Sequence, residues 1–374
     1  MMDVFESSGF EYKILRPIQH TRDGEPVLLA TRREYLGVAT TAVDLRPLHV
    51  THENAQRVRA RLSEELQLSR LLRHPHVGEV LGVAVNGEQP YVVMEHVSGC
   101  SLETALNAAA LVKRKVSIGF ATTVAQAVAE ALEHAHQCVD DEGRPLHAVH
   151  RAVAPANIQI SQRGRVKLVN FGSAYSELFG RPRTPEGLLR GAATYAAPEV
   201  LRELQAPRNR RRARARAAPG KRADIFSLGL VLLGALTGWH PLDPPDSSKE
   251  QLLPLPPGTQ AEVTPSIPLE LLAARLLRFG PKDVERAGRG LPARLRQIVA
   301  RALRVDPSER YPSALALADE LRGFRSAQWP QYREQELAAE VAALISAAKK
   351  LDRSVAYSVT EPGVLPAEKP WRIS

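Results

Sequence analysis

The apolar residues of this chain change their spacing once, near Gly99, and this change constrains the fold more than any other feature of the sequence. Before it, apolar residues come in short runs separated by turn signals such as Asp23-Gly24 and Asn86-Gly87, which is typical of a small sheet. One stretch, 54–72, instead repeats apolar residues at helical spacing. We therefore predict one helix and five strands, at 12–18, 26–31, 38–45, 77–85 and 89–95.

After Gly99 the pattern predicts a mostly helical second part, with a short hairpin over 158–169. The predicted helices cover 101–109, 118–136, 224–236, 269–277, 292–303 and 313–324. Beyond Phe324, an apolar stripe of Leu337, Val341, Leu344 and Ala348 predicts one more helix, which docks either on its own domain or on a partner. Docking on its own domain is the simpler outcome.

Composition excludes several classes of protein. The 374 residues are 44% hydrophobic and 24% charged, which is enough for a packed core in two lobes. Two cysteines, Cys100 and Cys138, cannot form a disulfide framework or a four-cysteine zinc site. The longest apolar run, 225–236, is shorter than the roughly 20 residues of a membrane-spanning helix. Because the first ten residues also lack a signal-peptide pattern, we expect a cytoplasmic protein.

The basic charge is concentrated in one segment. The net charge is +9, and residues 207–222 carry eight basic residues and no acid, so the rest of the chain carries only +1. Such a run is typical of a solvated loop, or of a surface for an acidic protein, for nucleic acid or for an anionic surface. No aromatic residue interleaves with the arginines to stack on bases. A protein partner is therefore favoured over nucleic acid bound through 208–222.

Six short motifs follow one another in a fixed order along the chain. They are Tyr91-Val-Val-Met-Glu-His-Val97, His150-Arg151 with Asn157, Phe171-Gly172, Ala197-Pro198-Glu199, Asp224-Ile-Phe-Ser-Leu-Gly229 and Asp306-Pro-Ser-Glu-Arg310. Ala152 and Asn157 are five residues apart, and Asn170 follows Ala152 by eighteen. Together the motifs resemble the eukaryotic-type bacterial serine/threonine protein kinases over about 12–324.

The resemblance implies an α+β, bilobal protein-kinase-like fold. It places a small antiparallel sheet with one helix at 1–97 and a larger, mostly helical lobe at 98–325, with an Arg-rich insertion at about 205–222. A C-terminal helix and tail follow at 326–374. His150, Arg151 and Phe171 are then expected to act as scaffolding. His134 and His136 lie two apart on a helix and point to different faces, so they do not form a metal site.

The same resemblance shows which catalytic groups are missing. The family's catalytic aspartate, which accepts the substrate's hydroxyl proton, falls on Ala152. The lysine two residues later, which stabilises the moving phosphoryl group, falls on Ala154, and the threonine that tethers both side chains falls on Ala192. An alanine cannot accept a proton, and loss of a general base costs on the order of 10²- to 10⁴-fold in rate.

Nucleotide binding is expected to be impaired as well. The metal-binding aspartate is replaced by Asn170, which leaves Asn157 as a second neutral ligand and makes a poor magnesium site. The strand lysine falls on Val43, so that its partner Glu65 lacks a cation. The remaining positions of this vestigial pocket are the single retained loop glycine, the two expected adenine covers and the segment joining the lobes, namely Gly24, Thr41, Gln159, Met94, Glu95 and His96.

The resemblance therefore predicts a catalytically impaired kinase-like protein, a pseudokinase, that works as a protein-binding or regulatory signalling module. No cofactor is expected, although ATP bound without efficient use of magnesium is compatible with these residues. The expected partners are signalling proteins, for example a protein kinase or an acidic protein. The alternative is a serine/threonine kinase with weak or relocated chemistry, in which Lys13, Arg16 or Arg46 replaces the missing lysine.

Overall fold

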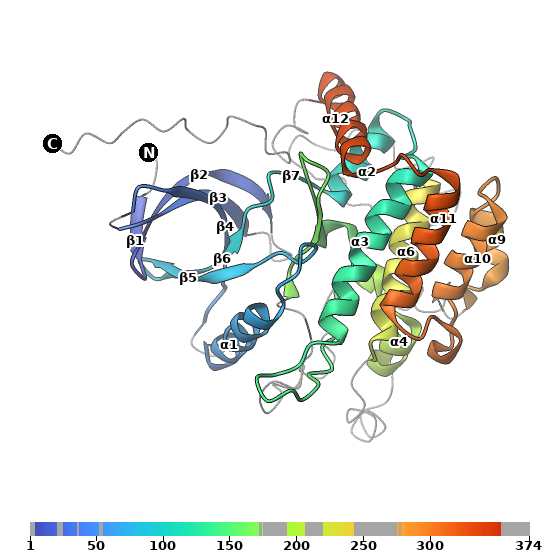
Figure 1. Cartoon of the computed structure of the whole chain (residues 1–374). Coiled ribbons are helices and arrows are strands. Elements are labelled where there is room, and N and C mark those ends of the chain that lie inside the picture. The colour runs from blue at the N-terminus through green and yellow to red at the C-terminus, as the bar shows by residue number, and fades with distance from the viewer. Residues whose placement is uncertain are drawn as a thin grey trace.

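The computed structural model of the chain describes residues 4–20, 25–35, 37–51, 55–171, 174, 193–205, 220–242, 275–276 and 278–352. These residues form two lobes, a small one built around a curled sheet and a larger one built of helices (Figure 1). The predicted α+β, bilobal architecture is thereby confirmed.

The small lobe is a six-stranded antiparallel sheet in the order β1-β2-β3-β4-β6-β5. One helix, α1 (Ala55–Leu71), accompanies the sheet, close to the predicted span. The structure adds one short strand that the sequence did not predict, because its four residues are too few to show a period. The strands are β1 (Val4–Ser7), β2 (Phe10–His20), β3 (Pro26–Glu34), β4 (Thr40–Pro47), β5 (Val80–Asn86) and β6 (Gln89–Glu95).

Alternation along β4 decides which of its side chains enter the core of the small lobe. Val43 and Leu45 are completely buried in a cluster with residues of the neighbouring strands, such as Tyr12 and Ala30. Because successive side chains of a strand point to opposite faces, Asp44 and Arg46 lie on the other face. That face carries the polar contacts of the site described below.

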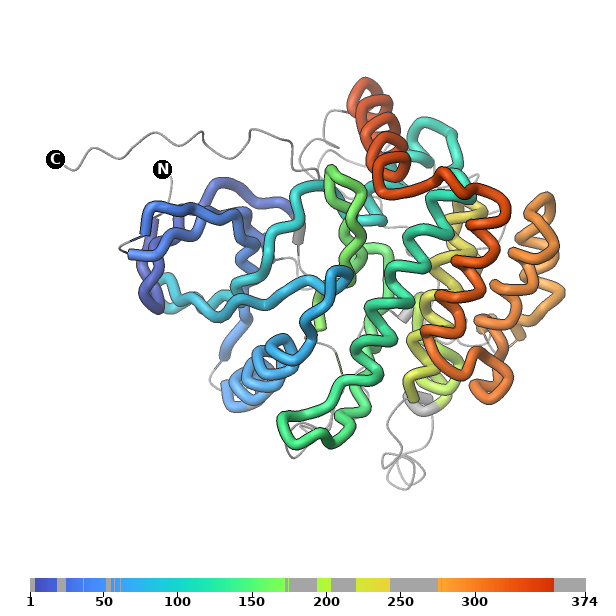
Figure 2. The backbone as a smooth tube through the Cα atoms, in the orientation of Figure 1, coloured from blue at the N-terminus to red at the C-terminus, as the bar shows by residue number. Residues whose placement is uncertain are grey.

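The larger lobe packs around α6 (Arg222–Thr237), in which Ile225, Phe226, Leu228 and Leu230 are fully buried. The other helices form layers beside α6, and Figure 2 shows α3, α6 and α11 running side by side. A three-stranded sheet of β7 (Gly99–Ser101), β8 (Ile158–Ser161) and β9 (Val166–Leu168) lies toward the small lobe. The helices are α2 (Leu102–Leu111), α3 (Ile118–His136), α4 (Pro198–Gln205), α9 (Pro281–Ala287), α10 (Ala293–Ala302), α11 (Ala314–Gln328) and α12 (Glu334–Leu351).

Most of the predicted elements are present, with shifted ends. The strand predicted at 38–45 runs from Thr40 to Pro47, and the one predicted at 77–85 begins at Val80. The short helices α4 and α9 were not predicted, since each spans only about two turns. The helix predicted at 269–277 lies mostly outside the described residues, as does the Arg-rich insertion.

A buried ion pair holds α4 to the far end of the larger lobe. Arg310, of which only 2% is exposed, donates from both Nη atoms to the carboxylate of Glu199 at 2.8 and 2.7 Å. The same guanidinium donates to the carbonyls of Arg222, Arg304 and Val305. Every N–H group of the Arg310 guanidinium thus has a hydrogen-bond acceptor, which offsets the cost of burying its charge.

The C-terminal helix α12 docks on its own domain, against α2 and α3 (Figure 1). Its buried stripe is Leu337, Val341, Leu344, Ile345 and Ala348. Glu340 anchors the helix, because its carboxylate accepts hydrogen bonds from the Ser117 amide, the Ser117 hydroxyl and the Tyr332 hydroxyl, each at 2.6 Å. Docking on the chain's own domain is thus the outcome that the structure shows.

The described helices were also considered as membrane spans. None of those in the described ranges combines the length and the apolar character that a crossing of the bilayer requires.

Truncation of the α12 stripe tests how strongly this helix is held. We expect Leu344→Ala to lower the free energy of unfolding by about 2–4 kcal/mol, since Leu344 is 2% exposed and the change leaves a cavity. Leu351→Ala, the same change on the same helix at a residue that is 65% exposed, is expected to cost less than about 0.5 kcal/mol. Equal losses in chemical denaturation would mean that α12 is not docked.

Acid should destabilise the larger lobe through His240, which is 1% exposed and packs edge-on against Tyr195 at 4.9 Å between ring centroids. Burial lowers its pKa from 6.5 to about 4, so the unfolded chain binds the proton more readily than the folded one. The neutral His240 therefore contributes up to ~3 kcal/mol to the free energy of unfolding. This stabilisation is fully present above about pH 6.5 and is lost as the pH falls toward 4.

The measurement for His240 is chemical denaturation at several pH values between these limits. We expect His240→Phe to lose less stability than the wild type on acidification, because the variant has no imidazole to protonate. Parallel pH profiles of the two proteins would contradict the assignment.

Candidate functional site

The loop that carries His150 is held from below by one buried carboxylate. Asp224 of α6 accepts the backbone N–H groups of His150 and Arg151, each at 2.8 Å, and lies 2.9 Å from Nε2 of His136. Burial raises the pKa of Asp224, but the hydrogen bond and charge of His136, together with His150, outweigh it and lower the pKa. The loop is thereby fixed to α3 and α6.

His150 and Phe171 continue this scaffold toward the small lobe. The His150 ring meets the Phe171 ring edge-on at 4.5 Å between centroids, and its Nε2 lies 3.1 Å from the Val169 carbonyl. Burial is also the main cause that lowers the pKa of His150, which favours the neutral ring. These contacts match the scaffolding role expected for the two residues.

The two alanines of the loop carry only methyl side chains. Ala152 and Ala154 are 3% and 4% exposed. Their backbone oxygens have structural partners, since the Ala152 carbonyl accepts Asn157 Nδ2 at 2.7 Å and the Ala154 carbonyl accepts the Asn157 amide at 3.0 Å. Neither side chain can accept a proton or stabilise a phosphoryl group.

The two expected metal-binding positions bind each other. Asn170 donates from Nδ2 to Oδ1 of Asn157 at 3.2 Å, and Oδ1 of Asn170 accepts from Nη1 of Arg46 at 3.2 Å. Both amide oxygens therefore already accept a hydrogen bond, and neither residue carries the negative charge that a hard cation prefers. This pair does not fit a magnesium ion, and no cluster of potential metal ligands occurs among the described residues.

Arg46 corrects the prediction that Glu65 lacks a cation. Nη2 of Arg46 lies 2.7 Å from both carboxylate oxygens of Glu65, so a close ion pair joins β4 to α1. Glu65 is only 6% exposed. In protein kinases a strand lysine and a helix glutamate make this ion pair, and here an arginine makes it.

The assignment of the lysine position to Val43 is therefore wrong by three residues. Val43 is completely buried in the core of the small lobe, and Val43-Asp44-Leu45-Arg46 takes the place of the family's Val-Ala-Ile-Lys. Thr41, predicted to cover the adenine, shifts in the same way: it is exposed, and its hydroxyl donates to the Arg32 carbonyl at 3.3 Å. Asp44 stands where Thr41 was expected.

A carboxylate and an imidazole meet at the position where the family has an apolar contact with adenine. Asp44 Oδ1 lies 2.6 Å from Nδ1 of His96, whose side chain is 2% exposed. Burial raises the pKa of Asp44, and the His96 hydrogen bond offsets only part of this rise. A polar, internally paired group in this slot is unfavourable for a flat apolar base.

Residues of the segment that joins the lobes contact neighbouring strands of both lobes. Oε2 of Glu95 accepts from Nζ of Lys167 on β9 at 2.8 Å, and Met94 is the register partner of Asp44. Gln159 lies on β8 opposite Lys167, and its expected role as an adenine cover stays a prediction. Gly24, Ala192 and Gly172 lie outside the described residues.

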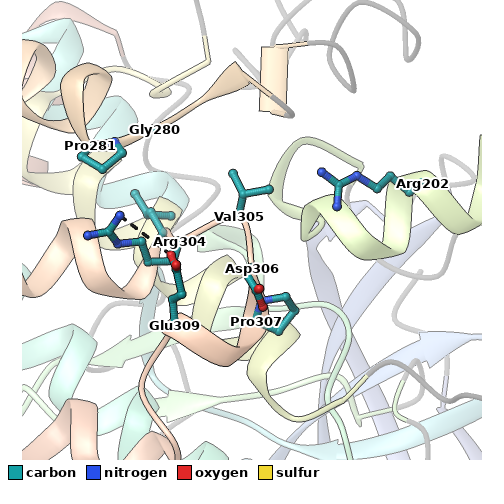
Figure 3. A pocket seen from close by; sticks show the side chains of 9 residues that line it. Arg202, Gly280, Pro281, Arg304, Val305, Asp306, Pro307 and Glu309 are labelled. Atoms are coloured by element: carbon teal, nitrogen blue, oxygen red, sulfur yellow. Dashed lines mark ion pairs between the residues drawn. The ribbon is translucent and has the colours of Figure 1, made fainter.

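A cavity of about 590 Å³ lies away from this cleft, between α4, the start of α9 and the 303–309 segment (Figure 3). Its charged side chains are partly paired, because Arg304 lies 3.8 Å from Glu309 and Asp306 accepts the Ser308 amide at 2.8 Å. The cavity therefore offers no concentrated charge for a ligand.

Three lysine substitutions along β4 test the corrected register. We expect Val43→Lys to destabilise the protein by about 3 kcal/mol or more, because an ammonium would enter an apolar core. Arg46→Lys keeps a cation beside Glu65 and should cost less than about 2 kcal/mol. Thr41→Lys at an exposed position is the control, expected within about 0.5 kcal/mol. A tolerated Val43→Lys in chemical denaturation would restore the original assignment.

Comparison with known proteins identifies the family of the fold. The model of the protein kinase domain matches residues 45–321. Tyrosine-protein kinase MasK of Myxococcus xanthus is 30% identical over 263 residues, 70% of this chain and 35% of that protein. Serine/threonine-protein kinase PknK of Mycobacterium tuberculosis is 28% identical over 304 residues, 80% of this chain and 22% of that protein. Serine/threonine-protein kinase PrkC of Bacillus subtilis is 27% identical over 272 residues, 73% of this chain and 35% of that protein.

The chain thus spans about a third, or less, of the length of these relatives. Its family match nevertheless extends from the middle of β4 into α11, through both lobes. The chain therefore belongs to the protein kinase family, with bacterial eukaryotic-type kinases among its relatives.

Proposed function

We propose that this kinase-like chain is a pseudokinase, which acts as a protein-binding or regulatory signalling module and does not transfer phosphate efficiently. One observation supports the proposal most: the side chains at the expected nucleotide site bind each other through successive hydrogen bonds, from Glu65 through Arg46 and Asn170 to Asn157. The side chain of Asn157 in turn donates to the backbone carbonyl of Ala152, whose methyl group can accept no proton.

The charges in this chain of contacts support the proposal. In active kinases, catalysis depends on positioning and on charge stabilisation by metal ions, a lysine and an aspartate. Here the two asparagines contribute no charge, and Ala152 and Ala154 stand where the family has a catalytic aspartate and a lysine. The relatives are named as kinases, so the proposal departs from their names on the strength of these side chains.

The second candidate is a weak kinase with relocated chemistry, and Arg46 is the observation that favours it. Of the cations considered for this role, Arg46 is the one whose ion pair with Glu65 the structure shows, on the cleft face of β4. Any phosphoryl transfer by this route should disappear in Arg46→Ala. It would still lack a general base at Ala152, which limits the expected rate.

Phosphoryl transfer and nucleotide binding are measured together to test the proposal. We expect no incorporation of radiolabelled phosphate into the protein or a generic substrate above a mock preparation. In thermal shift with millimolar ATP, magnesium should add nothing to any shift, because the asparagine pair does not bind it. Transfer above the mock preparation, abolished by Arg46→Ala, would replace the pseudokinase by the second candidate.

The control is a variant with the family's charges restored: Arg46→Lys, Ala152→Asp, Ala154→Lys and Asn170→Asp. If the cleft has lost only charge, this variant should gain a magnesium-dependent shift with ATP. In a matched set, Val43→Lys takes the place of Arg46→Lys. This set should fail to fold stably, because Val43 is completely buried. Thermal unfolding of both sets shows whether a missing response to ATP reflects the binding site or an unfolded protein.

A further inference from the structure

A basic and aromatic surface lies on the larger lobe, beside the loop that carries His150 and Pro155. Its residues take no part in the hydrogen bonds between Arg46, Asn170 and Asn157. We define it as Lys113, Arg114 and Lys115, which follow α2, together with Trp239, which follows α6. The three basic residues are exposed, and Trp239 is 43% exposed. The Lys115 ammonium lies 5.2 Å from the centroid of the Trp239 ring. Two segments far apart in sequence thus form one surface.

The backbone holds both segments in place. Lys113 has a φ of 53°, and the amides of Lys113 and Arg114 donate to the last carbonyls of α2 at 3.0 and 2.8 Å. Gly238 has a φ of 85°, and its amide donates to the Gly234 carbonyl at 2.8 Å. The Thr237 hydroxyl donates to the Trp239 carbonyl at 3.1 Å. A rigid surface loses little entropy when a ligand binds.

A small cavity of about 40 Å³ connects the two segments. It is lined by Arg114 and Lys115 of the first segment and by Trp239 and His240 of the second, together with Pro155 of the loop that carries His150. Because burial lowers the pKa of His240 to about 4, this ring is neutral at physiological pH and the positive charge lies at the rim. The surface therefore combines an apolar depression with cations around it.

Within the described ranges, the three cations have no acidic partner, unlike the exposed Arg144 and Arg322. Arg144 pairs with Asp140 at 2.7 Å and Arg322 with Glu130 at 2.7 Å, whereas no described carboxylate forms an ion pair with residues 113–115. Three consecutive unpaired cations give a positive local potential, which attracts an acidic ligand. An exposed tryptophan beside them is the residue type that most often contributes strongly to protein interfaces.

We propose that residues 113–115 and Trp239 bind an acidic segment of a partner protein that also carries an apolar side chain. Its carboxylates pair with the three cations, and its apolar group packs on Trp239 over the cavity. Sequence-tolerant binding of single-stranded nucleic acid uses several stacking aromatics, and this surface has one. The proposal rests on the proposed protein-binding function and names the chemistry of the partner.

The probe is a fluorescein-labelled peptide of twelve residues in which glutamates alternate with leucines and phenylalanines. Binding to the full chain is measured by fluorescence anisotropy, and it should weaken as salt rises from about 50 to about 200 mM, since salt screens the exposed charges. Trp239→Ala should weaken binding by about 10-fold or more. Reversal of the three cations, Lys113→Glu, Arg114→Glu and Lys115→Glu, should abolish it.

The matched control reverses three exposed cations on and after α9: Lys282→Glu, Arg286→Glu and Arg289→Glu. It changes the net charge equally and should leave the affinity within about 3-fold. The control also accounts for peptide held by residues 207–222, because such binding would respond alike to both reversals. Thermal unfolding of each variant verifies that it is folded.

Three results would overturn the proposal: no binding of the peptide, equal losses in the two charge reversals, or displacement of the peptide by an equal concentration of oligothymidylate. The last result would assign the surface to nucleic acid. A phosphoryl-transfer assay on the same preparations separates the two proposals. If neither phosphoryl transfer nor peptide binding is observed, only the proposal of a docking surface is contradicted. If both are observed, only the pseudokinase proposal is contradicted.

Discussion

The buried carboxylate of Asp224 is the interaction on which the centre of this molecule depends. It joins α6 to the loop through the amides of His150 and Arg151, and it joins α6 to α3 through His136. A buried charge left without partners is strongly destabilising, and here three hydrogen-bond donors surround the carboxylate of Asp224. The loop conformation is therefore set from beneath, by groups that do not face the cleft.

This arrangement supports the loop through side chains other than the two alanines that lie at the expected catalytic positions. The groups that support the loop, Asp224 and His150, are buried under it, whereas Ala152 and Ala154 present methyl groups where the charges would be. Replacing a cleft-facing aspartate by alanine removes no contact of Asp224. The ion pair of Arg310 with Glu199 likewise involves neither alanine. The contacts that hold the loop are thus made by other side chains than those at the expected catalytic positions.

The sequence predicted the fold better than it predicted the register of one strand. Motif order identified both lobes, and periodicity placed α1 and α3 within one residue or less of the observed ends. In β4 the motif was read three residues too early, which exchanged the two faces of the strand. Alternation would have corrected this, because apolar Val43 and Leu45 belong on the core face and Arg46 on the other.

Other features could not be predicted from one sequence. The contact of Asp44 with His96 joins residues 52 apart, and the contact of Lys115 with Trp239 depends on where two helices end. No local pattern encodes either meeting. By contrast, the apolar stripe of α12 predicted its buried face correctly, although the anchoring of Glu340 on Ser117 required the three-dimensional structure.

The choice of arginine at position 46 has a consequence for the two lobes. A lysine is a point charge, whereas the guanidinium is a planar fork that binds two partners at once. Nη2 of Arg46 holds Glu65 on α1, while Nη1 holds Asn170, which hydrogen-bonds Asn157 of the larger lobe. In active kinases, nucleotide and metal ions join the corresponding groups. Here side chains themselves make the connection, so hydrogen bonds of Arg46 and Asn170 join the two lobes at this point.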